Sequence, residues 1–400
     1  MNTSVDLATT AVRAGIETDT QHGAVVPPLY LSANFSFSGF NARRQYDYTR
    51  SGNPTRDLLG AALAELEGGV AAIVTASGMA AVMLPLQLLK PGDGLVIPHD
   101  CYGGSYRLFT AWAHKRHFEL QIIDQTDPHA LRTALEKKPR LVWVETPSNP
   151  LLRITDLREV VQLAHRVNSL VVVDNTFLSA LWQRPLEYGA DLVLYSTTKY
   201  INGHSDVVGG AVISAHAALH EELAWWANCL GVTGAPFDSY LTLRGLRTLP
   251  ARLRVHEENA AAMVKLLTRH PAVHRVYYPG LSTHPGYPIA ARQQASFGAM
   301  VSFELRGGET QIRAFLDGLR HFSLAESLGG VESLVAHPAT MTHAAMEVEA
   351  RRHAGIRDTL LRLSIGIESS ADLLSDLEAG LCRAAKLAVT PDFAAAEGCP

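Results

Sequence analysis

Short apolar runs separated by helix-length segments dominate the first half of the chain. Seven runs occur between residues 71 and 214, and most are continuous stretches of valine, isoleucine and leucine. Strands buried on both faces show this continuous pattern, and helix-sized connections between strands are typical of a parallel sheet. We therefore predict an α/β fold with a mostly parallel seven-stranded sheet. The predicted strands are residues 71–76, 94–98, 118–124, 140–145, 169–174, 191–196 and 208–214.

A helix is predicted just before the first strand. Asn53 is a suitable N-cap, Pro54 suits the first helical position, and Gly68-Gly69 ends the apolar stripe. The residues before Asn53 are rich in turn formers and aromatics and show no sustained period, which indicates an extended arm.

The second half of the chain has a different pattern. Residues 216–270 are largely helical in character, and three later strand-like runs alternate with helices, as in a smaller sheet packed beside helices. These runs are residues 273–279, 297–305 and 360–368. We expect an N-terminal arm over 1–55, a large domain over 56–255, a smaller α+β domain over 256–385 and a disordered tail over 386–400.

Composition excludes several classes of function. Of the 400 residues, 47% are hydrophobic, and the net charge of −4 comes without a basic block, which argues against nucleic acid or an anionic membrane surface as a partner. No apolar run reaches the roughly 18 residues that a membrane-spanning helix needs. The scattered Cys101, Cys229, Cys382 and Cys399 favour neither a disulfide framework nor a zinc site. We expect a cytoplasmic protein that acts on small molecules.

Polar residues follow the predicted strands at the sheet edge where ligands bind in doubly wound folds. In TASGM, residues 75–79, the backbone N–H groups of Gly78 and Met79 would open a helix and could bind phosphate. An ordinary strand-to-helix turn is the alternative for this motif alone, because short glycine motifs occur often by chance.

Two later strand ends carry charged groups. Asp174 ends a buried strand, where a carboxylate needs a cationic partner unless it serves only a turn. The next strand leads into Ser196, Thr198 and Lys199. In an extended segment, Ser196 and Thr198 would project to the same side and could grip phosphate together. Taken alone, Lys199 could equally be a solvated surface lysine, like most lysines.

The combination predicts pyridoxal 5'-phosphate as the cofactor. The phosphate needs a helix N-terminus and hydroxyls, the ring nitrogen needs an acid, and the aldehyde needs a lysine. In this interpretation Asp174 keeps the ring nitrogen protonated, so that the ring can accept electrons from the substrate. Lys199 holds the aldehyde as a Schiff base and then becomes a general base.

Several motifs at these residues are similar to one known family. The chain resembles the Cys/Met-metabolism family of pyridoxal phosphate enzymes over roughly residues 8–385, with the fold type I architecture of aspartate aminotransferases. The motifs are DCYGGSYRLF (100–109), ETPSNPLL (145–152), VVDNTF (172–177), STTKYINGHSD (196–206) and AESLGGVESL (325–334).

The resemblance implies roles for the cofactor site. The residues matching Lys199, Asp174 and Tyr102 hold the aldehyde, pair with the ring nitrogen and stack on the ring. Tyr48 and Arg50 match a pair that reaches into the neighbouring subunit's site, which implies at least a dimer. The resemblance implies a homotetramer built as a dimer of dimers, the usual assembly of the family. The phosphate ligands from the same chain match Gly78, Met79, Ser196 and Thr198.

The resemblance also implies a substrate site. Arg362 matches the arginine that binds the substrate α-carboxylate, although an arginine on a polar strand face is more often only solvated. Asn149 matches a residue beside the ring and this carboxylate, with an Asn-Pro turn as its local alternative. Glu326 is expected to face the distal amino group, and Arg107 the succinyl carboxylate of an activated homoserine. The expected substrate-binding residues are Arg362, Asn149, Glu326, Ser327, Arg107 and Asp47.

The implied reaction is γ-replacement. O-succinyl-L-homoserine and L-cysteine would give L-cystathionine and succinate, in methionine biosynthesis. Cleavage of cystathionine by γ-elimination is the alternative within the family, and the acyl group of the homoserine stays open. A nicotinamide dehydrogenase is disfavoured because no G-x-G-x-x-G follows an early strand, and a metal hydrolase because no H-E-x-x-H occurs, so no metal is expected.

Overall fold

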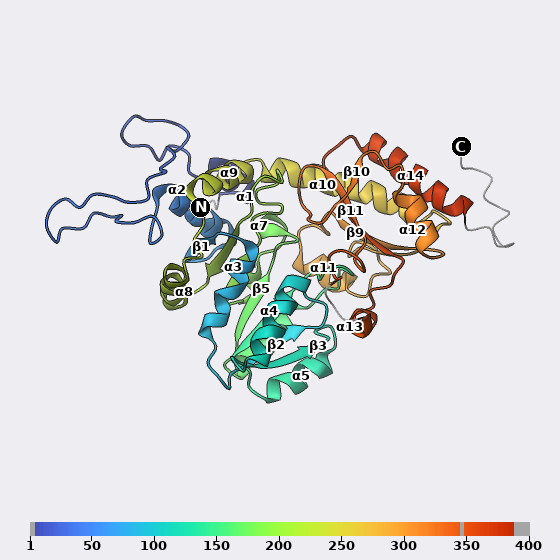
Figure 1. Ribbon diagram of the computed structural model, residues 1–400, viewed down its shortest axis with the longest axis horizontal. Helices are drawn as coiled ribbons and strands as arrows, with labels where there is room; N and C mark the ends of the chain where they lie inside the picture. The colour runs from blue at the N-terminus through green and yellow to red at the C-terminus, as the bar shows by residue number, and fades with distance from the viewer. Residues whose placement is uncertain (1–4, 345–347, 388–400) are drawn as a thin grey trace. The chain divides into compact units, whose positions relative to one another are not determined.

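The computed structural model describes residues 5–344 and 348–387 (Figure 1). Most of the tail expected over 386–400 lies outside the described residues, as does Cys399. The chain forms two compact units. The first comprises the residues up to Pro98, Leu108–Glu145 and Asp156–Pro250, and the second comprises His99–Arg107, Thr146–Thr155 and the chain from Ala251 onwards. The domain boundaries expected from the sequence stay predictions.

The first unit contains the predicted seven-stranded sheet. Its strand order is β1-β7-β6-β5-β4-β2-β3, and β7 runs antiparallel to both of its neighbours while β2 to β6 are parallel. The predicted mostly parallel α/β sheet is therefore confirmed. The strands are β1 (Ala71–Thr75), β2 (Gly94–Pro98), β3 (Glu119–Ile123), β4 (Leu141–Glu145), β5 (Leu170–Asp174), β6 (Leu192–Tyr195) and β7 (Gly210–Ser214).

Helices connect these strands. The regular helices of this part of the chain are α1 (Leu7–Arg13), α2 (Pro54–Glu67), α3 (Gly78–Met83), α4 (Gly103–His114), α5 (Pro128–Glu136), α6 (Leu157–Arg166), α7 (Ser179–Trp182), α8 (Ala217–Leu230) and α9 (Pro236–Leu246). Two 3₁₀ turns, η1 (Pro85–Leu88) and η2 (Pro185–Tyr188), complete the connections.

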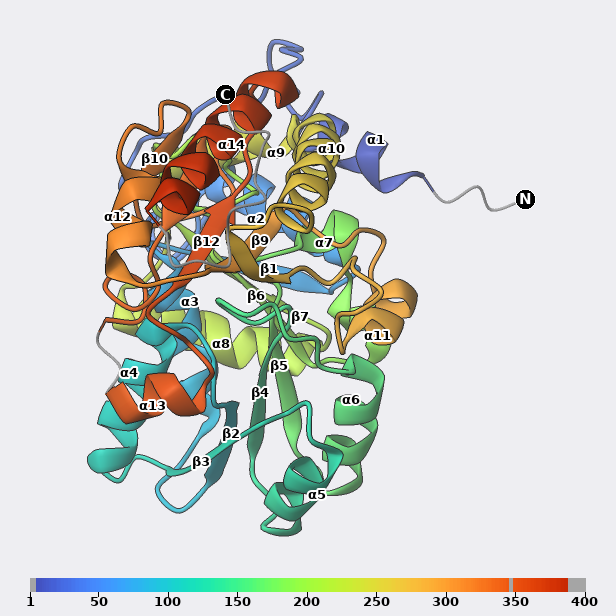
Figure 2. The same ribbon diagram turned by 90° about the vertical axis from the view of Figure 1, so that its right-hand side faces the viewer.

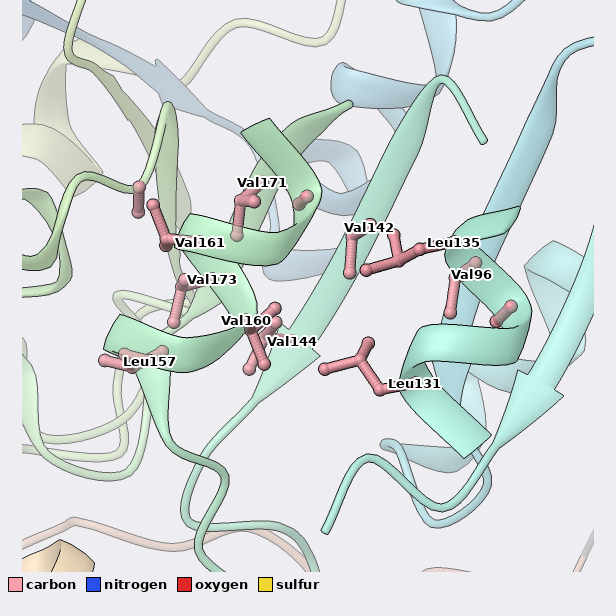
Figure 3. Close-up of a cluster of buried hydrophobic side chains, with 13 residues drawn as sticks. Val96, Leu131, Leu135, Val142, Val144, Leu157, Val160, Val161, Val171 and Val173 are labelled. Carbon is pink, nitrogen blue, oxygen red and sulfur yellow. The ribbon is translucent and has the colours of Figure 1, made fainter. Parts of the chain in front are cut away.

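Strand β4 shows why the apolar runs are continuous rather than alternating. Val142 and Val144 lie in a buried cluster with side chains of α5 and α6 (Figure 3). The intervening Trp143 contacts Phe109 of α4 edge to face, with ring centroids 5.1 Å apart. Because successive side chains of a strand point to opposite faces, helices that cover both faces require an apolar residue at every position.

The first long helix begins and ends where the sequence predicts. The side-chain oxygen of Asn53 accepts hydrogen bonds from the backbone N–H groups of Thr55 and Arg56, and Gly68 ends α2 with φ of 80°. The Asn53 amide donates to the Tyr30 carbonyl at 3.0 Å, so the cap also ties the preceding segment to α2. Residues 14–52 form irregular backbone with turns, bends and isolated β-bridges, without a regular helix or strand.

The second unit contains a five-stranded sheet with the order β10-β11-β12-β9-β8 (Figure 2). Phe303 of β9 contacts Phe315 of α12 at 5.5 Å between ring centroids, and Gly380 lets α14 approach the same Phe315 closely. The predicted smaller α+β fold is confirmed. Its elements are α10 (Leu249–Leu267), β8 (Val273–Tyr277), α11 (Tyr287–Gln293), β9 (Met300–Leu305), α12 (Glu309–Leu316), β10 (Phe322–Leu324), β11 (Ser333–Ala336), α13 (Val348–His353), β12 (Leu360–Ser364) and α14 (Ser370–Lys386).

Among the described residues, no helix combines the length and the apolar character that crossing a bilayer would require.

Candidate active site

Asp174 is the last residue of β5, at the carboxyl edge of the first sheet. Its Oδ1 accepts a hydrogen bond from the backbone N–H of Thr176 at 3.1 Å, and the Thr176 hydroxyl also bonds to this carboxyl group. The same hydroxyl oxygen accepts from the backbone N–H of Ser196, which follows β6, at 2.9 Å. Thr176 therefore joins the acid at one strand end to the segment that leaves the next strand.

Burial changes the acidity of this carboxyl group. Loss of hydration raises the pKa of Asp174 to about 6, against the two hydrogen bonds from Thr176, which lower it. A cationic N–H placed against the carboxyl group would bring the pKa down again, because an opposite charge stabilises the ionised form. The site suits a protonated heterocycle.

Gly78 and Ser196 approach each other closely at the same sheet edge. Gly78 is the first residue of α3, and the hydroxyl of its N-cap, Ser77, accepts from the Ala80 N–H at 3.0 Å. A Cβ atom on Gly78 would lie 2.8 Å from both Cβ and Oγ of Ser196, so only glycine fits there. The N–H groups of Gly78 and Met79 open the helix beside a serine hydroxyl, a setting that fits a phosphate group.

The segment after β6 corrects one expectation. We expected Ser196 and Thr198 to be extended, but β6 ends at Tyr195 and the chain turns: the Lys199 N–H donates to the Ser196 carbonyl at 3.2 Å. The Thr198 hydroxyl accepts from the Gly209 N–H at 2.9 Å and donates to the Gly209 carbonyl at 3.2 Å. Strand-like alternation is therefore the wrong reason to pair Ser196 with Thr198, because backbone hydrogen bonds bend this segment.

The three remaining candidates of the first unit lie on the segment before α2. Asp47 forms an ion pair with Arg43 at 3.1 Å. Tyr48 is 47% exposed, and the Arg50 guanidinium carbon lies 5.4 Å from the centroid of its ring. Arg50 also donates from Nε to the Asn228 side-chain oxygen at 3.0 Å.

The second unit brings three substrate candidates together. Arg362 of β12 is buried, donates from Nη1 to the Asn149 side-chain oxygen at 2.8 Å, and donates from Nη2 to the Ser327 carbonyl at 2.9 Å. Both acceptors are uncharged, so these bonds orient the guanidinium without neutralising it. A planar guanidinium held in this way is suited to a carboxylate.

The neighbouring candidates are more exposed. Ser327 has φ of 91°, an uncommon conformation for a serine, and Glu326 before it is exposed. Tyr102 is 43% exposed, and Arg107 of α4 is exposed as well.

A histidine that the sequence analysis missed supports Asn149. His343 is fully buried, and its Nε2 lies 3.1 Å from the Asn149 carbonyl oxygen, to which it must donate. Desolvation, helped by the charge of Arg362, lowers the pKa of His343 to about 4, so the ring is neutral near pH 7. Its Nδ1 then accepts from the Thr342 hydroxyl at 2.8 Å. Nothing in the local sequence marks this histidine, because its partner lies 194 positions away.

The sequence analysis also missed a buried carboxyl group that supports the ends of β5 and β6. The buried Glu67 bonds to the Tyr195 hydroxyl, which accepts from the Asn175 side-chain amide at 2.9 Å. Desolvation raises the pKa of Glu67 to about 8, and desolvation together with Glu67 raises that of Tyr195. Because Asn175 follows Asp174 and Tyr195 precedes Ser196, this network supports both strand ends.

Comparison with known proteins agrees with this chemistry. The sequence profile of the family described as "Cys/Met metabolism PLP-dependent enzyme" matches residues 8–382. The chain belongs to this family. Its cofactor is therefore pyridoxal 5'-phosphate, as predicted, and the chain is a pyridoxal-phosphate-dependent enzyme.

The relatives of the chain include enzymes named as cystathionine synthases and as cystathionine lyases. Cystathionine gamma-synthase of Escherichia coli (strain K12) is 57% identical over 380 residues, covering 95% of this chain and 98% of the relative. Cystathionine beta-lyase of Coxiella burnetii is 45% identical over 383 residues, covering 95% and 99%. The solved cystathionine gamma synthase of Xanthomonas oryzae pv. oryzae, in complex with aminoacrylate and cysteine, is 67% identical, with a TM-score of 0.95 and coverage of 96% and 99%.

The described residues fit the family cofactor. Asp174 is a desolvated acid at a strand end, and the glycine at position 78 leaves no room for a side chain beside the Ser196 hydroxyl. Within residues 5–344 and 348–387, no cluster of three or more His, Cys, Asp or Glu side chains could hold a metal ion.

The Glu67 pKa predicts how stability depends on pH. Above pH 4.5 the unfolded carboxyl group ionises, while the folded one keeps its proton up to about pH 8. Stability should therefore fall as pH rises through this window, by an amount on the order of a few kcal/mol. Glu67→Gln keeps the shape of the side chain but cannot ionise, so its urea unfolding should lose this part of the pH dependence.

The exposed Glu65 of the same helix provides the control. Glu65→Gln should retain the wild-type pH profile, measured at the same protein and cofactor concentrations. Equal profiles for wild type and Glu67→Gln would show that Glu67 does not keep its proton in the folded state.

Proposed function

We propose that this enzyme catalyses γ-replacement of O-succinyl-L-homoserine by L-cysteine, giving L-cystathionine and succinate. The observation that carries the proposal is the 67% identity, over nearly the full length of both chains, to a cystathionine gamma synthase solved with cysteine. The beta-lyase relative is less similar, at 45%. In the reaction the bond from Cγ to the acyl oxygen breaks, and a bond from Cγ to the cysteine sulfur forms.

The first unit would hold the cofactor and move protons. Lys199 holds the aldehyde and, after the substrate amine displaces it, removes the Cα proton and then transfers a proton at Cβ. Asp174 keeps a proton on the ring nitrogen. When bound, pyridoxal phosphate supplies a cationic ring that accepts the electrons released at Cα.

The phosphate of the cofactor would bind to groups at the same sheet edge and to a neighbouring subunit. The residues of the same chain are Gly78, Met79, Ser196 and Thr198, of which Thr198 is already paired with the Gly209 backbone. Arg50 and Tyr48 would complete the phosphate site of the neighbour.

The second unit would recognise the amino-acid substrates. Arg362 binds the α-carboxylate with two N–H donors, and Asn149 fixes the plane of the guanidinium. Tyr102 stacks on the cofactor ring and assists deprotonation of the cysteine thiol. Glu326 faces the amino group of the incoming cysteine, and Arg107 faces the succinyl carboxylate. Ser327, and Asp47 on the arm, complete the proposed substrate contacts.

A second copy of this chain would cover the segment before α2. Seven large apolar side chains there are exposed, which favours a partner for this segment. We propose a homotetramer built as a dimer of dimers, located in the cytoplasm. The exposed side chains are Val25 (60%), Val26 (43%), Tyr30 (43%), Leu31 (65%), Phe37 (49%), Phe40 (104%) and Tyr48 (47%).

A substrate panel tests the proposed reaction. Purified enzyme with pyridoxal phosphate receives cysteine together with one ester of L-homoserine. The succinyl, acetyl and phosphoryl esters are tested in separate assays. We expect the fastest formation of cystathionine with the succinyl ester, and no turnover by Lys199→Ala. Cleavage of cystathionine alone, to 2-oxobutyrate or to pyruvate, at a higher rate than its synthesis would contradict γ-replacement and indicate a lyase.

Mixing two inactive variants tests the shared site. Arg50→Ala and Lys199→Ala chains, unfolded and refolded together, form hybrids in which one site has Lys199 from one chain and Arg50 from the other. If Arg50 serves the neighbour, the mixture should regain about a quarter of the wild-type activity, because half of randomly formed dimers carry one intact site of two. Activity no higher than the sum of the separate variants would place Arg50 in the site of its own chain.

A further inference from the structure

We infer that Asp100 is a positioning residue for recognition of the substrate carboxylate. The inference rests on the proposed role of Arg362 and Asn149. The effect of Asp100 on Asn149 and Arg362 passes through Ser148 and Arg153.

Asp100 is almost completely buried, with 4% of its side chain exposed. A single carboxylate oxygen, Oδ2, accepts from the Ser148 hydroxyl at 2.6 Å and from Arg153 Nη1 at 2.8 Å. A ring nitrogen of His99 lies 3.9 Å from the other oxygen. A buried carboxylate is stable only with such partners, so the ion pair with Arg153 accounts for its charge.

These bonds join two separate segments of the second unit. Asp100 lies in His99–Arg107, which also carries Tyr102, while both of its hydrogen-bond donors lie in Thr146–Thr155, which carries Asn149. The clamp formed by Asp100, Ser148 and Arg153 therefore joins the two segments that supply predicted site residues.

The clamp fixes the residue immediately before Asn149. The Ser148 hydroxyl donates to Asp100 and accepts from the Arg153 N–H at 3.2 Å, so the side chain has one orientation. The Ser148 N–H donates to the Arg153 carbonyl at 3.0 Å, which closes a turn around Asn149. The Nη2 atom of Arg153 donates to the Ala354 carbonyl at 2.9 Å. Asn149 thus lies within a rigid turn, and its side-chain oxygen accepts a hydrogen bond from Arg362.

The charge of Asp100 matters as well as its shape. Arg153 forms an ion pair with Asp100, and both Asp100 and Arg362 act electrostatically on His343. Without Asp100 the guanidinium of Arg153 would lose its carboxylate partner, and the Ser148 hydroxyl would lose its acceptor. Both changes would misplace Asn149 relative to Arg362, and small misplacements cost affinity because carboxylate binding is directional.

Two simple amines separate carboxylate recognition from general damage. Glycine and methylamine both displace Lys199 from the bound cofactor, which changes its visible absorption, but only glycine has a carboxylate for Arg362. We expect Asp100→Ala to weaken glycine binding by about 10- to 100-fold, the loss associated with one misplaced charged hydrogen bond. Methylamine binding should change less than about threefold, since it lacks that bond. Asp100→Asn, whose amide oxygen can still accept from Ser148 and Arg153, should lose less.

Asp376 provides the matched control. It is a buried carboxylate of the same unit that accepts from the Arg320 and His321 N–H groups at 3.0 and 2.7 Å. Asp376→Asn should leave the glycine-to-methylamine affinity ratio at the wild-type value, even if it lowers stability.

Three outcomes would overturn the inference. An unchanged glycine-to-methylamine affinity ratio in Asp100→Ala, whether both affinities stay the same or fall equally, would show that Asp100 does not position the carboxylate site. An equal fall of the ratio in Asp376→Asn would show the same. A wild-type enzyme with no preference for glycine would overturn the assignment of Arg362 and, with it, the inference that rests on that assignment. The substrate panel measures the reaction type independently. A result there that indicates a lyase would therefore not change the interpretation of the amine affinities.

Discussion

The carboxyl group of Asp174 sets the main constraint on this protein. It lies at the end of a strand whose other side chains are apolar, and desolvation raises its pKa to about 6. Thr176 supplies two hydrogen bonds, and a cation is the partner that would keep the group ionised throughout the neutral range. A protonated cofactor ring is such a cation. The α/β sheet places this acid, at the end of β5, next to the segment that follows β6, where Ser196 approaches Gly78 closely.

The second unit uses a complementary arrangement. Arg362 is held by neutral oxygens, whereas Arg153 is paired with the carboxylate of Asp100. The hydrogen bonds of Arg153 keep a turn in place, whereas those of Arg362 orient a guanidinium that we propose to bind the substrate carboxylate. Burial makes both arrangements sensitive to single substitutions, since an unpaired buried charge is costly.

The sequence predicts those features that local pattern determines. The seven strands, the caps of α2 and the position of Asp174 at a strand end follow from apolar runs, capping residues and turn formers. The short strands β10 and β11 were not predicted, because three or four residues give too little pattern. The segment after Tyr195 was wrongly predicted to be extended, since its bend depends on hydrogen bonds between Lys199 and Ser196 and between Thr198 and the distant Gly209.

The supporting residues escaped prediction for a related reason. Thr176, Asp100 and His343 act through partners that the fold brings together, and the Asn149 carbonyl lies 194 positions from His343. Family resemblance supplied Arg362 and Asn149 as candidates, but the hydrogen bond between them became visible only in the structure.

The protonation state of the cofactor ring nitrogen tests the account most directly. Enzyme reconstituted with pyridoxal phosphate labelled with ¹⁵N in the ring can be followed by NMR across the neutral pH range. The account predicts a protonated ring nitrogen in the wild type and a largely unprotonated one in Asp174→Ala. A ring nitrogen that is unprotonated in the wild type, or equally protonated in both proteins, would contradict it.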